Sequence, residues 1–352
     1  MNILLVRLRL IGDVVFTTPA IRAIRRHYPD ARIAYVVEEE AAPVVQNNPH
    51  LDEVIVATSP HSAGRLRADL ALIRRLRRDR YDLAIDFHGG PRSSLLTWAS
   101  GAPQRIGYRV AGRSWMYTTC VPRPRALRPR HSVVSQWDVL LPLGIAAPDP
   151  EIDTPDMPED PVAAAAVDRR LADAGIGAGN PIVVLHVSAG NPFRRWPAGS
   201  FVDLVCRLAA ADPRRRIILT SGPSDAGAAS SIADAARARL TAADRNAVVQ
   251  CGEFDLAELR SLIGRAALYI GGDSGPLHVA GTTAVPVVGL YGPTLPVRSQ
   301  PYRSATLIHA AAEVHGLPCR PCNQRRCEPG DFRCLTGISA EGVAELAERS
   351  LR

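Results

Sequence analysis

The feature that most constrains this chain is a strand–loop–helix pattern that begins twice, at residue 2 and again at residue 182. Each beginning is a short run of branched apolar residues, followed by a loop and a segment of helix length. Apolar strands that alternate with helical segments predict a parallel sheet covered by helices. The 352 residues suffice for two such domains. We therefore expect an α/β protein with two doubly wound, Rossmann-like domains, whose ligands bind at the carboxyl ends of the strands.

The expected elements follow this pattern in both halves. In the first half, strands are expected at 2–6, 32–37, 54–57, 83–87 and 105–108, and helices at 14–27 and near 65–80. In the second half, strands are expected at 182–187, 216–220, 247–250, 267–270 and 286–291, and helices at 198–210, 226–240 and 256–266. The last segment, 340–351, has the pattern of an amphipathic helix with Ser339 as its N-cap.

A change of composition marks the expected domain boundary. Residues 147–161 contain five prolines, six acidic residues and no arginine, a composition typical of a linker. We therefore expect an N-terminal domain at 1–155, a C-terminal domain at 162–338 and a terminal helix at 339–352.

Positive charge is concentrated in the first half of the chain. Residues 1–150 carry 21 arginines against 13 acidic residues, the remainder carries 21 against 22, and there is no lysine. Between 87 and 137 there is no acidic residue, and the eight arginines are Arg92, Arg105, Arg109, Arg113, Arg123, Arg125, Arg128 and Arg130. Such a patch attracts an anionic partner, and the guanidinium fork suits phosphate. For any single arginine, an ordinary solvated surface position is an equal alternative.

Nothing in the sequence predicts export or a membrane span. The first apolar run, 3–6, is too short for a signal peptide, and the uncharged stretch 274–297 holds four prolines. We expect a cytoplasmic protein with reduced cysteines. Four of them follow the spacing Cys319-x2-Cys322-x4-Cys327-x6-Cys334. This cluster suggests a structural zinc or iron site, with free cysteines that pack as small apolar side chains as the alternative.

The strongest local motif is the run Gly-Gly-Asp-Ser-Gly-Pro-Leu-His at 271–278, between an apolar strand and a helix. Its glycines permit close approach of a ligand, and the N–H groups of a helix start favour phosphate. Ser274 can cap that helix. Asp273 would repel phosphate, so we expect it to accept hydrogen bonds from sugar hydroxyls, with His278 within reach of the ligand. The alternative is a capped helix start without a ligand.

Two further loops follow strands. The first ends with Gly12 and Asp13. Asp13 can serve as a general base or as the N-cap of the helix 14–27, and the residue types alone favour the cap. The second loop, 188–197, contains Arg194 and Arg195. These could neutralise a leaving diphosphate or lie on an ordinary surface.

Two long segments resemble a known family. NILLVRLRLIGDVVFTTPAIRAIRRHYPDARI at 2–33 and IGGDSGPLHVAGTTAVPVVGLYGPT at 270–294 resemble the family 9 glycosyltransferases, the bacterial lipopolysaccharide heptosyltransferases. The segments FRRWP at 193–197 and LPCRPCNQRRCEPGDFRCL at 317–335 fit the same family. The cysteine-rich segment is more similar to heptosyltransferase II than to heptosyltransferase I.

The resemblance implies a GT-B fold, with two Rossmann-like domains that face each other across a cleft. It implies inverting transfer of L-glycero-D-manno-heptose from ADP-heptose to the phosphorylated inner core of lipopolysaccharide, with no catalytic metal. The absence of an Asp-x-Asp pair agrees, since metal-dependent sugar-nucleotide enzymes hold their cation with neighbouring carboxylates. Cationic side chains and helix N-termini are then expected to stabilise the diphosphate.

The resemblance also assigns roles to residues. Asp13 becomes the general base, which reverses the preference for a cap, and Arg194 or its neighbour Arg195 contacts the donor diphosphate. Asp225 is a weaker candidate for the ribose. The expected donor-binding residues are Gly12, Ser188, Arg195, Asp225, Asp273, Ser274, Gly275 and His278.

The implied acceptor is an anionic glycolipid of the lipid A–Kdo–heptose type. Each basic residue near an anionic membrane contributes about 1 kcal/mol of attraction, so the arginines would hold the enzyme peripherally on the cytoplasmic face of the inner membrane. One alternative is a related enzyme that glycosylates a protein such as an autotransporter. A remote alternative is a nucleic-acid-binding protein with a zinc knuckle. Nucleic acid is not an expected partner, because aromatic residues make up 5% of the chain and stacking surfaces are scarce.

Overall fold

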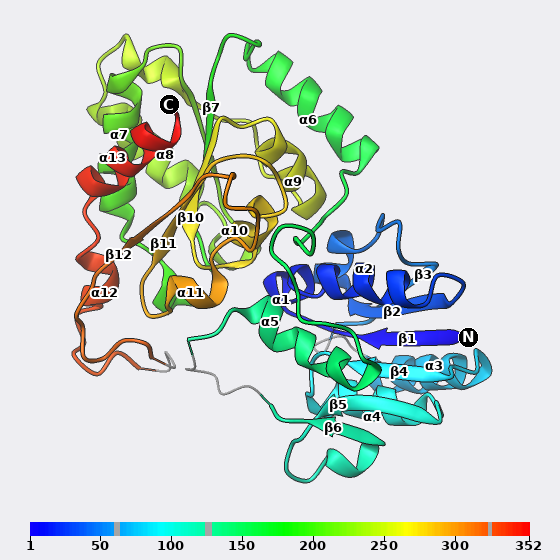
Figure 1. Ribbon diagram of the computed structural model, residues 1–352. Coiled ribbons are helices and arrows are strands. Elements are labelled where there is room, and N and C mark those ends of the chain that lie inside the picture. The colour runs from blue at the N-terminus through cyan, green and yellow to red at the C-terminus, as the bar shows by residue number, and fades with distance from the viewer. Residues whose placement is uncertain (60–63, 124–128, 323–325) are drawn as a thin grey trace. The chain divides into compact units, whose positions relative to one another are not determined.

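The computed structural model describes residues 1–352 except 60–63, 124–128 and 323–325. The chain divides into two compact units, residues 1–158 and 159–352 (Figure 1). The division falls inside the proline-rich, acidic segment 147–161. Arg125 and Arg128 of the basic stretch lie outside the described residues.

The first unit is built on a six-stranded parallel sheet. Its strands are β1 (Asn2–Val6), β2 (Arg32–Glu38), β3 (Glu53–Ala57), β4 (Leu83–Asp86), β5 (Gln104–Tyr108) and β6 (Thr119–Val121). They lie in the order β3-β2-β1-β4-β5-β6. The central strand β1 pairs with β2 on one side and with β4 on the other, and its residues Ile3–Val6 are fully buried.

The second unit contains a sheet of the same size. Its strands are β7 (Ile182–His186), β8 (Arg216–Thr220), β9 (Val248–Val249), β10 (Leu268–Gly272), β11 (Val287–Tyr291) and β12 (His309–Glu313). They lie in the order β12-β11-β10-β7-β8-β9, all parallel.

Both sheets have the same topology. When each is numbered from its own first strand, the order reads 3-2-1-4-5-6, which is that of a Rossmann fold. The chain reverses its direction of progress between β1 and β4 in one sheet and between β7 and β10 in the other. The prediction of two Rossmann-like units is therefore confirmed, and these two switch points are where each unit is expected to bind a ligand.

Helices cover both sheets. In the first unit they are α1 (Ile11–Val15), α2 (Thr18–His27), α3 (Arg65–Arg78), α4 (Pro91–Ala99) and α5 (Ser132–Trp137), with 3-10 turns η1 (Glu39–Val44), η2 (Ser114–Met116) and η3 (Asp138–Leu143). Leu76 of α3 and Leu96 of α4 pack on the same apolar cluster as Leu4 and Val6 of β1. Both helices therefore cover one face of this sheet.

The second unit has more helices. They are α6 (Pro161–Asp173), α7 (Ala198–Ala211), α8 (Ala228–Arg239), α9 (Leu256–Gly264), α10 (Gly275–Ala280), α11 (Pro296–Ser299), α12 (Arg333–Thr336) and α13 (Ala340–Ser350), with turns η4 (Pro192–Arg194), η5 (Pro223–Asp225) and η6 (Asp244–Ala247). The terminal α13 packs against α7 and buries Val343 and Ala347 in the core. Ser339 caps it, as predicted, by accepting a hydrogen bond from the Gly342 N–H.

The helix expected at 14–27 is broken into α1 and α2. Pro19 has no N–H to donate to the Val15 carbonyl, and the Thr18 hydroxyl donates to that carbonyl instead, at 2.8 Å. The edge strands β6 and β12 and the helices α4, α5, α6, α11 and α12 were not predicted from the sequence. β6 has three residues and β12 reads HAAAE, so neither carries the branched apolar run that marks a strand. Among the described residues, no helix is long and apolar enough to cross a membrane.

Candidate active site

Asp13 lies at the switch point of the first sheet. It follows β1, and its Oδ2 is 2.5 Å from Nη2 of Arg7, the residue directly after the same strand. Arg7 is buried, and its Nη1 donates to the carbonyl of Phe87, just beyond β4, at 2.7 Å. One guanidinium thus spans the gap between β1 and β4 and holds the carboxylate of Asp13 there.

The interpretation of Asp13 as a helix cap is wrong. Leu10 occupies the cap position of α1, and Asp13 lies within its first turn. The side chain of Asp13 is 34% exposed, and its Oδ1 accepts a hydrogen bond from Gln136 Nε2 at 3.4 Å. Gly12 is buried in α1 and its carbonyl accepts the Phe16 N–H. Asp13 is therefore an oriented carboxylate that solvent or substrate can reach.

His88 follows β4 on the other side of this switch point. Burial, and then the positive charge of Arg7, lowers the pKa of His88 to about 4. Its loop is held by Asp86, a fully buried carboxylate that the sequence analysis missed. Asp86 accepts from the His88 N–H at 2.8 Å, the Gly89 N–H at 2.9 Å, the Tyr117 hydroxyl at 2.6 Å and the Ser93 hydroxyl at 3.0 Å. Burial raises the pKa of Asp86.

Two of the predicted arginines reach the same loop. Arg113 and Arg123, which follow β5 and β6, each donate to the Gly89 carbonyl, at 3.3 and 3.4 Å. Among the described residues, neither has an acidic partner. The carboxyl ends of β1, β4, β5 and β6 therefore bring Asp13, a neutral imidazole and two arginines to one edge of the sheet.

The other described arginines of this stretch divide into two groups. Arg92 pairs with Glu38 and Asp69, and Arg130 pairs with Asp138, so their charges are compensated. Arg105 donates to two backbone carbonyls, and Arg109 is exposed. The positive charge of the stretch 87–137 is thus partly neutralised by acidic residues that lie outside it in the sequence.

Asp273 lies at the switch point of the second sheet, directly after β10. It is buried, and the Thr294 hydroxyl donates to its Oδ2. His278 Nε2 lies 3.5 Å from its Oδ1. Burial by itself would raise the pKa of Asp273, but the charges of Arg194 and His278 and the Thr294 hydrogen bond lower it overall. The carboxylate is therefore a buried anion engaged by Arg194 and Thr294, and its expected hydrogen bonds to sugar hydroxyls stay a prediction.

Arg194 reaches Asp273 from the loop after β7. Its Nη1 donates to the Asp273 carbonyl at 2.9 Å and lies 3.4 Å from Oδ2. A Cβ at Gly272 would come within 3.1 Å of the Arg194 carbonyl, so this glycine permits the two loops to touch. The side chain of Arg194 remains 32% exposed. Asp273 thus fixes a cation at the carboxyl ends of β7 and β10.

The helix start at 274–275 differs from expectation. Ser274 occupies the cap position of α10 but its side chain caps nothing; the hydroxyl donates instead to the Gly272 carbonyl at 3.3 Å. The extended backbone of Ser274 turns the hydroxyl back toward β10. Gly275 begins a helix of six residues, in which His278 is buried.

Ser188 and Arg195 tie the loop after β7 to the loop after β8. The Gly222 N–H donates to the Ser188 hydroxyl at 2.7 Å, and this hydroxyl lies 3.3 Å from Nε2 of His186. Arg195 Nη1 lies 3.2 Å from Oδ2 of Asp225. All the predicted donor-site residues of this unit therefore lie at the ends of the adjacent strands β8, β7 and β10, while Gly12 belongs to the other unit.

His186, which was not predicted as a site residue, is a neutral side chain that connects Ser188 with Thr220. Its Nδ1 lies 3.0 Å from the Thr220 hydroxyl, and burial lowers its pKa from 6.5 to about 4. Because the folded state resists protonation, the free energy of unfolding should fall as the pH falls from 6.5 toward 4. We expect a contribution of about 2 kcal/mol between pH 7 and pH 5.

This prediction is checked by urea unfolding at both pH values. His186→Gln, which can keep the hydrogen bonds but cannot titrate here, should lose about 2 kcal/mol less than the wild type on acidification. The same change at the exposed His315 is the control. Equal pH dependence in wild type and His186→Gln would show that His186 is not the buried neutral base.

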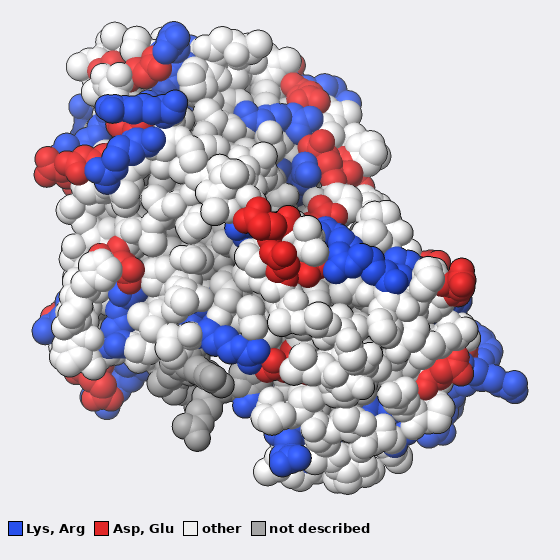
Figure 2. All heavy atoms as spheres, in the orientation of Figure 1, with Lys and Arg blue, Asp and Glu red and all other residues white. Residues whose placement is uncertain are grey.

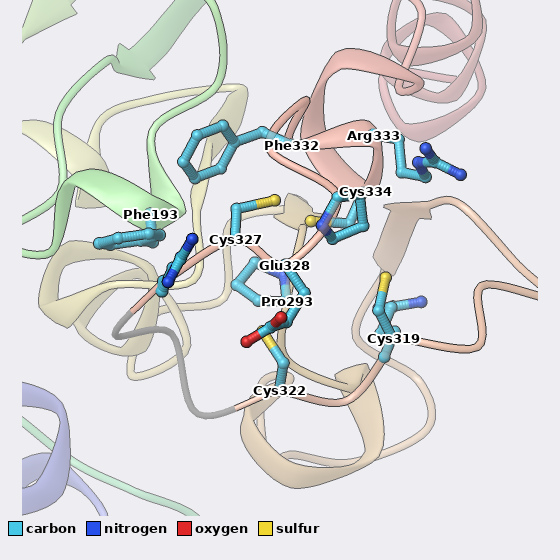
Figure 3. Close-up of a pocket in the computed structure, with 12 residues that line it drawn as sticks. Phe193, Pro293, Cys319, Cys322, Cys327, Glu328, Phe332, Arg333 and Cys334 are labelled. Carbon is cyan, nitrogen blue, oxygen red and sulfur yellow. The ribbon is translucent and has the colours of Figure 1, made fainter.

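The four clustered cysteines line one pocket of the second unit. Figure 3 shows Cys319, Cys322, Cys327 and Cys334 around it, and Phe193 and Phe332 at its rim have ring centroids 5.3 Å apart. Burial, and then the neighbouring thiols, raises the pKa of Cys334, which favours a neutral thiol. Within the described part of the chain, no group of three or more His, Cys, Asp or Glu side chains is arranged to hold a metal ion. The geometry therefore adds no support for a zinc or iron site.

Comparison with known proteins identifies the family. Residues 70–330 match the model of glycosyltransferase family 9 (heptosyltransferase). The chain is 28% identical to lipopolysaccharide heptosyltransferase 3 of Escherichia coli K12 over 98% of this chain and 96% of that one. It is 25% identical to lipopolysaccharide heptosyltransferase 2 of the same strain over 84% of each. These identities do not single out heptosyltransferase II, contrary to the expectation from the cysteine-rich segment.

Solved structures give the same answer for the fold. The crystal structure of a family 9 glycosyl transferase from Veillonella parvula superposes with a TM-score of 0.84 at 24% identity, covering 99% of this chain and 97% of that one. That of E. coli ADP-heptose lps heptosyltransferase II gives 0.74 at 19% identity, covering 100% and 98%. The two Rossmann-like units thus have the GT-B architecture. The chain belongs to glycosyltransferase family 9, the heptosyltransferase family, and is a glycosyltransferase.

Proposed function

We propose that this enzyme transfers heptose from ADP-heptose to a phosphorylated sugar of the lipopolysaccharide inner core, with inversion and without a catalytic metal. The observation that carries the proposal is the pairing of opposite charges at both switch points. Arg7 orients Asp13 at one, and Asp273 orients Arg194 at the other. The names of the similar proteins, lipopolysaccharide heptosyltransferases 3 and 2, support this choice of reaction.

In the proposed reaction Asp13 is the general base. Its partly exposed carboxylate takes the proton of the acceptor hydroxyl as that oxygen bonds to the anomeric carbon of heptose. The bond between this carbon and the ADP oxygen breaks in the same displacement, and the configuration inverts. Arg7 keeps the carboxylate oriented from its buried side.

Arg194 is proposed to stabilise the departing ADP. A guanidinium held by Asp273 is already oriented before charge develops on the diphosphate, which is the condition for effective electrostatic stabilisation. Arg195 and Asp225 are proposed to hold the diphosphate and the ribose. The adenine of ADP is proposed to bind in a cavity of about 170 Å³ beyond β8 and β9, which is lined in part by Thr220, Gln250 and Gly252.

The acceptor is proposed to be an anionic glycolipid of the lipid A–Kdo–heptose type. Arg113 and Arg123 converge on the Gly89 carbonyl near His88 and supply charge suited to phosphate. We place the enzyme peripherally on the cytoplasmic face of the inner membrane, where such an acceptor is made. The glycosidic linkage that is formed could be that made by heptosyltransferase 2 or that made by heptosyltransferase 3, and we propose neither over the other. A protein acceptor is the second candidate.

The test is a donor and acceptor screen with the purified enzyme. ADP-heptose, and not UDP- or GDP-sugars, should raise the melting temperature, because a ligand that binds the folded state stabilises it. Transfer should require a phosphorylated core glycolipid and should persist in EDTA. Loss of activity in EDTA would contradict metal independence. Transfer to a protein but not to the glycolipid would favour the second candidate.

A further inference from the structure

We propose that the first unit docks on an anionic lipid bilayer through an exposed apolar surface formed by Leu95, Trp98 and Trp115, here called the tryptophan patch. The inference rests on the proposed function, because a lipid-linked acceptor requires the enzyme to work at a membrane. It goes further by naming the side chains that enter the interface.

The tryptophan patch is formed by two neighbouring elements. Leu95 and Trp98 lie one turn apart on α4 and are 41% and 39% exposed, while Leu96 and Ala99 of the same helix are buried. Trp115 of η2, which packs on α4, is 62% exposed. The two indole rings meet edge to face with centroids 5.5 Å apart. The outward face of α4 thus ends in a pair of aromatic side chains in contact with each other and with solvent.

The other two tryptophans of the chain are not exposed. Trp137 and Trp196 are buried, and their indole N–H groups donate to the carbonyls of Ala146 and Ile338. Exposed large apolar side chains that cluster indicate an interaction surface more than scattered ones do. Tryptophan in particular favours the headgroup region of a bilayer, because its ring is apolar while its N–H can donate a hydrogen bond.

The surroundings of the patch carry positive charge. Arg105 Nε donates to the Met116 carbonyl at 2.8 Å, next to Trp115, and Arg113 immediately precedes η2. Arg109 is exposed on the same connection between β5 and β6. None of the three has a carboxylate partner within the described residues, and the sequence from 87 to 137 contains no acid. In Figure 2 the lower edge of the first unit, where Figure 1 places this connection, shows blue and white atoms but no red ones on the face in view.

The neighbouring helix extends this surface. α3 runs alongside α4, since Asp69 pairs with Arg92 near one end and Arg77 Nε donates to the Ala99 carbonyl near the other. α3 carries six arginines against one acid, and its Leu66 and Leu70 are exposed. Some of these arginines pair with acidic residues, as Arg75 does with Glu53, but the net charge of α3 remains positive. Apolar side chains on a surface of net positive charge match the two requirements of an anionic bilayer, which are apolar insertion and charge attraction.

A bilayer fits this surface better than a second copy of the chain. In a two-fold dimer the same patch would meet itself, so the arginines around Trp115 would face the same arginines. Such juxtaposed like charges oppose association. Arg113 also joins η2 to the Gly89 carbonyl, in the loop of His88. Docking at the tryptophan patch would therefore bring the candidate acceptor site close to the membrane.

The experiment measures binding of the full-length enzyme to vesicles of phosphatidylcholine, alone or mixed with phosphatidylglycerol, without donor or acceptor. The wild type should sediment with the mixed vesicles, with a blue shift of tryptophan fluorescence and with loss of binding as salt is raised. The double variant Trp98→Ala/Trp115→Ala should bind at least about ten-fold more weakly. Trp115→Ala alone, at the most exposed of the three positions, should show part of this loss in a protein of unchanged melting temperature.

Ile152→Ala is the matched control, because Ile152 is another exposed apolar side chain of the same unit, bonded through its carbonyl to Arg22 of α2. It should bind vesicles like the wild type. The proposal would be overturned if the double variant bound vesicles as well as the wild type does. It would also be overturned if the wild type formed a dimer but did not bind vesicles, and the double variant abolished that dimer. Activity toward a soluble deacylated acceptor separates it from the proposed function. The double variant should retain activity toward this soluble acceptor. If the wild type itself lacked that activity, the result would count against the proposed function but not against membrane docking.

Discussion

Replacement of Asp13 by asparagine should reduce heptosyl transfer by about 10²–10⁴-fold, the range expected for loss of a positioned general base. Asparagine fills the same space and can still accept a hydrogen bond from Gln136, but it cannot take the acceptor proton. Since all the candidate donor residues except Gly12 belong to the other unit, the affinity for ADP-heptose should change little. Single-turnover transfer and calorimetric titration with ADP-heptose measure the two effects separately.

A control for this variant is needed because Asp13→Asn also leaves the buried guanidinium of Arg7 without its counter-ion. Urea unfolding of the variant shows how much stability that costs, and transfer is compared under conditions in which the variant is fully folded. Asp30→Asn makes the same chemical change at an exposed position of the same unit and should be neutral. Transfer within a few-fold of the wild type by folded Asp13→Asn would refute the role of base.

The architecture could be predicted from the sequence because the central strands are uniform. Buried on both faces, β1, β7 and β10 each contain an apolar run (ILLV, IVVL and LYI), and parallel pairing follows from the helices between them. The edge strands β6 and β12 lack this signal, since one face or one edge of each is left to solvent. Their positions follow from pairing with β5 and β11, which periodicity along the chain does not reveal.

The site could be predicted in part. As the motifs indicate, Asp13, Arg194 and Asp273 lie in the segments that directly follow β1, β7 and β10; their part in the reaction stays a prediction. Their roles were harder to assign, because role depends on partners that are distant in sequence. Thr294 bonds Asp273 from 21 residues away, and Asp86 bonds Tyr117 from 31. Arg7, six positions before Asp13, interrupts an apolar run, and a cation at such a position is the local signal that it is buried and paired.

Asp273 also depends on partners that are distant in sequence, so its replacement is the second substitution for which we expect a large loss of stability and activity. Asp273→Ala should lower the free energy of unfolding by about 3 kcal/mol, at the lower end for a broken buried ion pair because Arg194 is partly exposed. It should also reduce transfer by at least about 10²-fold, because Arg194 loses the acceptor that orients it toward the diphosphate. Urea unfolding and the rate of transfer at saturating ADP-heptose measure the two losses.

Two further variants separate charge from packing at this position. Asp273→Asn keeps the shape and can still accept the Thr294 hydrogen bond, so it should recover most of the stability but little of the transfer rate. Asp225→Ala removes the partner of Arg195 in a more exposed ion pair, whose contribution to stability should stay below about 1 kcal/mol. If Asp273→Asn transferred heptose as fast as the wild type, the negative charge would not be what holds Arg194 in its working position. The carboxylate would then serve packing alone, and the stabilisation of ADP would have to come from Arg195.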